Sequence, residues 1–134
     1  MKTLLPIFIF FFSTVLSSSP SYAGWTKVTK DVNGNTSYVD FDKIRKHDGY
    51  VYYWDLTDYL EPMNGDLSAI VYNQGDCELF RFKYLSFVYH KQPMGRDTGE
   101  SNNPKNPEWE YPSPNSVGEI VLKAVCSKLI GVSF

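Results

Sequence analysis

Residues 50–60, with the sequence YVYYWDLTDYL, decide the fold because they form the clearest β-strand pattern in the chain. Side chains alternate between the two faces of a strand, so this segment divides into two sets. We predict that the more apolar set faces the core, and it consists of Tyr50, Tyr52, Trp54, Leu56 and Leu60. The other set is mixed and would leave its tyrosines half exposed, and it consists of Val51, Tyr53, Asp55, Thr57 and Tyr59.

Further strands are predicted on both sides of this segment. Residues 25–32 and 36–40 flank Asn33-Gly34-Asn35, which is a typical hairpin turn because Asn and Gly tolerate positive φ angles. Residues 40–46 resemble a short helical turn. Later strands are predicted at 67–72 and 77–90, with a short edge strand at 107–111. The 77–90 strand carries apolar residues on both faces with Arg81 and Lys83 between them, which predicts a β-bulge.

The last predicted element is a helix. Ser116 and Glu119 fit a capping box, and apolar residues recur at helical spacing from Val117 to Leu129. Residues 91–107, before the helix, form a long polar loop rich in Pro and Gly, and such loops are often functional. The predicted fold class is therefore α+β: a single antiparallel β-sheet of about five to six strands, with a C-terminal α-helix packed on one face and fastened by a disulfide.

The disulfide prediction follows from the N-terminal sequence. Lys2, an apolar run over 4–16 and the small residues of Ser21-Tyr22-Ala23 indicate a cleavable signal peptide over residues 1–23. The chain is then exported, and its two cysteines, Cys77 and Cys126, are predicted to pair. A redox or metal-binding pair is the alternative, but the chain has no CxxC motif and no evident set of four zinc ligands.

Composition argues against several classes of function. The formal net charge is −2 and the charges are scattered, so we expect no nucleic-acid partner. After the signal peptide no apolar stretch is long enough for a transmembrane segment, and no cysteine follows Ala23, so no lipid anchor is expected. The aromatic content is high, with 3 Trp, 10 Tyr and 9 Phe, which is typical of β-sheets and of contact surfaces.

No enzyme motif is visible, so we predict no catalytic residues, no metal and no cofactor. An acid–base enzyme could use His47 and His90, but nothing in the sequence brings these histidines together. Glu108 and Glu110 could form a carboxylate pair of the glycosidase type, although a short edge strand is a poor platform for one.

The ordered pattern of residues resembles the bacterial surface-adhesin protein E family. The resemblance covers nearly all of residues 25–130, which makes 24–134 a surface-adhesin protein E-like domain. It is carried by Trp25, Tyr38-Val39-Asp40, Ile44, Gly49, residues 54–59 (WDLTDY), Ser68, Asp76-Cys77, Arg81, Tyr89, Met94-Gly95, Trp109 and Cys126. The family implies a single sheet with a helix tied on by a disulfide. For its name-giving members it also implies cell-surface display, dimer formation and binding of host matrix proteins.

The expected function is that of an exported, non-enzymatic, adhesin-like binding module of the bacterial envelope, in the periplasm or at the cell surface. It would engage a protein partner or a second copy of itself. The alternative is a periplasmic protein that binds a small ligand or assists assembly. The residues predicted to bind lie on the mixed strand face and on the neighbouring strand, and they are Tyr53, Tyr59, Phe80, Phe82 and Tyr84.

Overall fold

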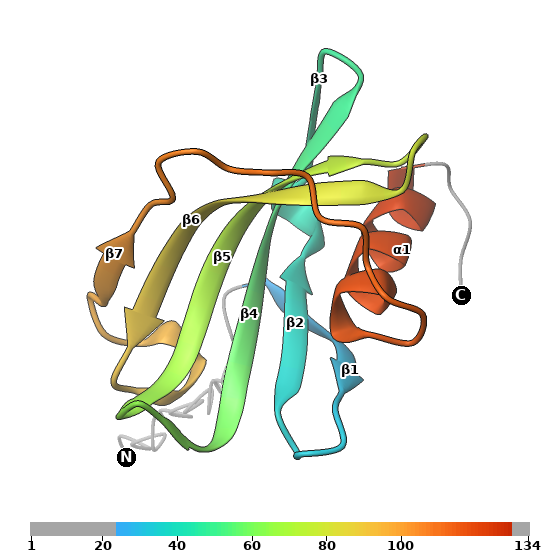
Figure 1. Ribbon diagram of the computed structural model, residues 1–134. Coiled ribbons are helices and arrows are strands. Elements are labelled where there is room, and N and C mark those ends of the chain that lie inside the picture. The colour runs from blue at the N-terminus through green and yellow to red at the C-terminus, as the bar shows by residue number, and fades with distance from the viewer. Residues whose placement is uncertain (1–23, 130–134) are drawn as a thin grey trace, which may run out of the picture.

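The computed structural model describes residues 24–129, which form one antiparallel sheet with a helix against one of its faces (Figure 1). The sheet has seven strands in the order β1-β2-β4-β5-β6-β7, and β3 pairs with β4 outside this order. The strands are β1 (Trp25–Lys30), β2 (Thr36–Asp40), β3 (Arg45–His47), β4 (Tyr50–Met63), β5 (Asp66–Asp76), β6 (Arg81–His90) and β7 (Glu100–Asn102). The predicted fold class is confirmed, with two short strands beyond those expected. The signal peptide prediction lies outside the described residues.

The C-terminal helix α1 (Val117–Leu129) begins where the capping box predicts. The backbone N–H of Glu119 donates to Ser116 Oγ at 3.2 Å, and Glu119 Oε1 accepts from the backbone N–H of Asn115 at 3.1 Å. The first bond satisfies a donor that the first helical turn leaves without an intrahelical partner. The second ties Asn115, the residue before the cap, to the start of the helix. Within residues 24–129 no helix is long and apolar enough to span a membrane.

The apolar side of α1 packs over β1, β2 and β4 and defines the helix-covered face of the sheet (Figure 1). Val51 and Tyr53 of β4 lie beneath it at 1% and 2% exposure, whereas Tyr52 and Trp54 are half-buried on the opposite, open face. The prediction that the helix and core lie on the Tyr52 and Trp54 side of β4 is therefore wrong, although Leu56 of that set is buried at 0% exposure as predicted. The core cluster between the helix and the sheet consists of Val39, Val51, Tyr53, Phe82, Val121, Leu122 and Val125.

Gly75 of β5 makes room for the helix on the face that carries Val51 and Tyr53. A Cβ atom added to Gly75 would lie 2.9 Å from Val51 Cγ1 and 3.0 Å from Leu122 Cδ1. The missing side chain therefore lets the helix approach the sheet on the Val51 side. Alternation along β4 could not reveal this, because both of its faces carry aromatic residues.

The predicted bulge in β6 is confirmed. Asn73 of β5 pairs with Tyr84, but Tyr72 pairs with Ser86, so one residue of β6 is extra. Side-chain alternation shifts at this point. As a result Tyr84 and Phe87, three residues apart, lie on the same helix-covered face and their rings are 5.1 Å apart.

The segments predicted as turns and loops contain more regular structure than expected. The helical turn is confirmed as a 3₁₀ turn, η1 (Phe41–Lys43), but strand β3 follows it directly. The predicted 91–107 loop contains a second 3₁₀ turn, η2 (Pro93–Gly95), and strand β7. The predicted edge strand at 107–111 is reduced to one bridge between Glu110 and Phe82.

Candidate binding surfaces

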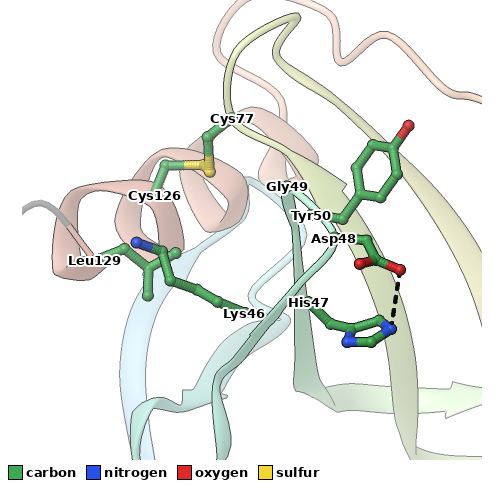
Figure 2. Close-up of a pocket in the computed structure, with 8 residues that line it drawn as sticks. All are labelled: Lys46, His47, Asp48, Gly49, Tyr50, Cys77, Cys126 and Leu129. Atoms are coloured by element: carbon green, nitrogen blue, oxygen red, sulfur yellow. Dashed lines mark ion pairs between the residues drawn. A yellow bond between two sulfur atoms is a disulfide. The ribbon is translucent and has the colours of Figure 1, made fainter.

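The disulfide joins Cys77, in the turn between β5 and β6, to Cys126 on α1, with a Cα–Cα distance of 5.7 Å. The predicted pairing is confirmed. The bond fastens the helix to the sheet at the end where β3 and β4 meet (Figure 2). Among the described residues no group of His, Cys, Asp or Glu could hold a metal ion.

A cavity of about 520 Å³ lies beside this disulfide, between the β3–β4 turn and the last turn of α1 (Figure 2). His47 Nε2 lies 3.1 Å from Asp48 Oδ2 at its rim, and these side chains are 72% and 83% exposed. Water screens a pair with that exposure, so the pair adds little stability or order to the site. The cavity therefore offers no ordered acid–base pair.

The two histidines lie at opposite ends of the sheet. His47 pairs with Tyr50 of β4, whereas His90 pairs with Ser68 of β5, which in turn pairs with Asp58 of β4. Tyr50 and Asp58 are about 27 Å apart along an extended strand. The structure therefore does not bring His47 and His90 together in one site.

His90 instead belongs to a hydrogen-bond network that joins residues 92–97 to β4, β5 and β6, at the end of the sheet away from the disulfide. Its Nδ1 lies 3.1 Å from Asp97 Oδ1, and Ser68 Oγ donates to the carbonyl of Gln92 at 2.7 Å and accepts from the N–H of Gly95 at 2.9 Å. Asp58 Oδ1 accepts from the N–H of Met94 at 2.9 Å. Residues 92–97, in the first half of the predicted polar loop, are thus fastened across the open face.

The five residues predicted to bind fall into two groups. Tyr53 and Phe82 are buried in the core at 2% and 6% exposure, and Phe80, at φ 53, packs against that core from the β5–β6 turn. The side chains of these three residues pack in or against the core beneath the helix. Tyr84 is 36% exposed and Tyr59 is half-buried, so these two keep part of their surface accessible.

Three of these residues also line a cavity of about 230 Å³ between the first turn of α1 and strands β4, β5 and β6, here called the helix-side groove. Its lining consists of Tyr53, Asp55, Thr57, Val71, Asn73, Phe82, Tyr84, Phe87, Val117, Gly118 and Val121. A second hollow of about 250 Å³ shares Tyr84 and Phe87 with it and extends to Glu108 and Glu110. Neither lining includes a lysine or an arginine.

Asp55 is the chemically distinctive group of the helix-side groove. Burial raises its pKa from 3.8 to about 7, although a hydrogen bond from Asn73 Nδ2 to its Oδ2 at 2.6 Å acts in the opposite direction. Burial also raises the pKa values of Tyr53 and Tyr84, and the charge of Asp55 adds to both shifts. Near neutral pH the groove thus holds a carboxyl group that can either donate a proton in a hydrogen bond or, once ionised, receive a cation.

The open face carries a second surface, which the sequence had placed in the core. An aromatic row crosses it: Trp54 and Tyr72 are stacked cross-strand neighbours with ring centroids 4.5 Å apart, and Tyr52 lies 6.1 Å from Tyr72. Tyr50 and Trp109 continue the row with centroids 5.4 Å apart. All five rings are half-buried, so each exposes part of its surface to solvent.

Basic side chains border the aromatic row. The guanidinium of Arg81 lies 4.1 Å and the ammonium of Lys83 lies 4.5 Å from the centroid of the Trp109 ring. Arg81 also pairs with the buried Asp76 at 2.9 Å, which holds the arginine in place. These contacts hold Trp109 against β6 although its segment has only one bridge to the sheet.

The sequence contained a signal for this surface. Tyr50, Tyr52 and Trp54 lie at alternate positions, and Tyr72 follows in the next strand, so the row follows from the alternation rule once the covered face is known. The contribution of Trp109 could not have been found in this way, because it depends on how residues 103–116 cross the sheet (Figure 1).

The comparisons with known proteins agree with this architecture. The family model described as Surface-adhesin protein E matches residues 25–127. One solved structure of Haemophilus influenzae protein E, in crystal form II, is 17% identical, covers 79% of this chain and 89% of its own, and has a TM-score of 0.59. Another structure of Haemophilus influenzae protein E is 15% identical to this chain and has a TM-score of 0.60. The match covers 84% of this chain and 90% of the other. At these identities the structural likeness concerns the fold. A search of curated proteins gave no match.

Proposed function

Because the chain belongs to the surface-adhesin protein E family, we propose that it is an exported, adhesin-like module that binds a protein partner through the aromatic row of its open face. The role is one of binding without catalysis. Export through cleavage of residues 1–23 is part of the proposal, and the Cys77–Cys126 bond supports it because disulfides persist outside the reducing cytoplasm.

The observation that carries this proposal is the half-exposed stack of Trp54 and Tyr72 on the sheet face opposite the helix. Tyr, Trp and Arg are enriched among the residues that contribute most to binding at protein interfaces. The rigid rings of Tyr and Trp lose little conformational entropy when a partner covers them. Arg45, opposite Tyr52, and Lys83, opposite Gln74, share this face and add positive charge beside the rings. A protein partner with an apolar centre and acidic edges would fit such a surface.

We expect the double variant Trp54→Ala/Tyr72→Ala to lose about 30-fold or more in affinity for its partner, because two adjacent hot-spot residues would be removed together. The family makes host matrix proteins the first partners to test. The measurement is surface plasmon resonance on immobilised matrix glycoproteins, with protein exported and processed from the full chain.

The matched control is Val32→Ala, which removes a fully exposed apolar side chain from the β1–β2 turn at 101% exposure. It should bind as the unmodified protein does. Equal affinity of the double variant and the control, with both folded by circular dichroism, would contradict the proposal. Sedimentation velocity at micromolar concentration shows in addition whether the row joins two copies of this chain, in which case the double variant would be monomeric.

A second candidate function is small-ligand binding in the helix-side groove, and the observation that favours it is the cavity around Asp55. An ionised Asp55 in a groove that Tyr84 and Phe87 also line, without a lysine or arginine in the lining, suits an alkylammonium group. We expect small amines to raise the melting temperature at pH 8 more than at pH 6, since Asp55 is largely ionised at the higher pH. Carboxylic acids serve as the matched panel, and Asp55→Asn should abolish the amine effect. No amine-dependent shift at pH 8 would remove this candidate.

A further inference from the structure

Asp40 carries a buried carboxylate oxygen without a partner. Asp40 is the last residue of β2 and is 3% exposed. Its Oδ1 is buried and has no hydrogen-bond partner within the described part of the chain. The other oxygen, Oδ2, lies 3.7 Å from Nζ of Lys43, whose side chain is 66% exposed. Buried carboxylate oxygens are normally hydrogen-bonded, so an unmatched one calls for a physical explanation.

Gly24 lies directly against this oxygen. Its neighbour Trp25 pairs with Asp40 in the β1–β2 ladder, which fixes the position of Gly24 beside the Asp40 side chain. A Cβ atom added to Gly24 would lie 3.2 Å from Asp40 Oδ1 and 3.5 Å from its Oδ2. Because glycine has no Cβ, this position next to the carboxylate is empty.

Cleavage after Ala23 would change what can occupy that position. In the precursor the nitrogen of Gly24 is an amide bonded to Ala23. In the processed chain it is a free ammonium group, and rotation about the Cα–C bond of Gly24 can move it to the place of the absent Cβ. Nitrogen and carbon substituents stand at nearly the same distance from Cα, so the ammonium would then be within ion-pair reach of Oδ1. A side chain at residue 24 would compete for this space.

We propose that signal-peptide cleavage creates an ion pair between the new α-ammonium group of Gly24 and the buried carboxylate of Asp40, which locks the first strand onto the sheet. The proposal rests on the predicted cleavage site and is independent of the partner that the open face binds. It assigns Asp40 as the acceptor of the processed N-terminus. It also explains why a glycine precedes β1 and why Asp40 Oδ1 has no partner among residues 24–129.

The test compares two mature N-termini produced by export of the full chain. One is the natural chain, and the other carries one alanine inserted between Ala23 and Gly24, so that processing leaves an extra residue and displaces the ammonium group. Mass spectrometry identifies both N-termini. We expect the extended form to melt roughly 4–8 °C lower, because it lacks one charge-assisted bond to a buried carboxylate. In the Asp40→Asn background the two forms should melt together.

A chemical measurement keeps the test decisive if Asp40→Asn folds poorly. Acylation requires the neutral amine, and an ion pair that raises the pKa of the α-amine by about one unit lowers the reactive fraction about tenfold. The α-amine of the natural mature chain should therefore be acylated about tenfold more slowly than that of the alanine-extended chain.

Equal melting temperatures together with equal acylation rates would overturn the proposed ion pair. A mature chain that begins at any residue other than Gly24 would overturn it too. Neither result bears on binding by the aromatic row, because the Trp54→Ala/Tyr72→Ala comparison uses one N-terminus throughout. Failure of the ion pair is thus distinguishable from failure of the proposed function.

Discussion

Removal of the disulfide by the double variant Cys77→Ala/Cys126→Ala is expected to lower the free energy of unfolding by about 4 kcal/mol. The bond closes a loop with a sequence separation of 49 residues, and loop closure restricts the unfolded chain. A domain of this size has a net stability of only about 5–15 kcal/mol, so the loss would be a large fraction of it. Urea unfolding measures the effect, and we expect the midpoint to fall by about 2 M.

The structure also predicts where the loss appears first. Helix α1 is joined to the sheet through residues 103–116, which contain no helix or strand, so Cys126 is its covalent fastening to the β5–β6 turn. Amide exchange in α1 should therefore accelerate before exchange in β4 and β5. The control is the unmodified protein treated with reductant and blocked at both thiols, which should reproduce the double variant. An unchanged urea midpoint would show that helix packing alone holds α1.

The fold was predictable from sequence where local chemistry decides the structure. The helix start follows from Ser116 and Glu119, whose side chains bond backbone N–H groups within one turn. The bulge in β6 follows from apolar residues on both sides of Arg81 and Lys83. The disulfide follows from the export signal and from having two cysteines. Each of these predictions depends on neighbours in sequence or on simple counting.

The choice of sheet face was not predictable from sequence because it depends on contacts between distant residues. Tyr52 and Tyr53 are the same residue type, yet one lies on the open face and the other under the helix at 2% exposure. On the Tyr53 side, Gly75 leaves room for Leu122 of the helix. Strand β3 was missed for a similar reason, since Arg45 to His47 are all exposed and have no apolar alternation.

The candidate site was only partly predictable for the same reason. The prediction included Tyr53, Phe82 and Tyr84, which border the helix-side groove, but it missed Phe87, which the bulge in β6 brings to the same face. It did not find the role of Asp55, because the shift in its pKa arises from burial among three strands and a helix. Burial of this kind is a property of the assembled fold.

Asp55 leads to the second large effect, which is a dependence of stability on pH. Its pKa in the folded state, about 7, is higher than the ordinary value of 3.8, so the folded protein holds a proton on Asp55 that the unfolded chain releases. This contribution is fully present below pH 4, decreases as the pH rises, and is lost once the pH passes 7. At 1.36 kcal/mol per pH unit, the loss between pH 4 and pH 8 is up to about 4 kcal/mol.

Substitution of Asp55 by asparagine is expected to abolish this loss, since the amide keeps the size of the carboxyl group and does not ionise. At pH 8 Asp55→Asn should be more stable than the unmodified protein, and at pH 4 the two should be similar. Asp76 contributes in the opposite sense, because hydrogen bonds from Leu79 and Arg81 outweigh its burial and lower its pKa. The difference between the two proteins removes that contribution, which both share. Urea unfolding at pH 4, 6 and 8 measures the effect.

The matched control is Asp42→Asn, which changes an exposed aspartate in η1 and should leave the pH dependence as it is. Stability of Asp55→Asn that falls with pH as steeply as that of the unmodified protein would show that Asp55 titrates normally. The helix-side groove would then lack a proton-binding carboxyl group, and its preference for amines at pH 8 over pH 6 would lose its physical basis. The measurement on stability therefore also tests the chemistry on which small-ligand binding depends.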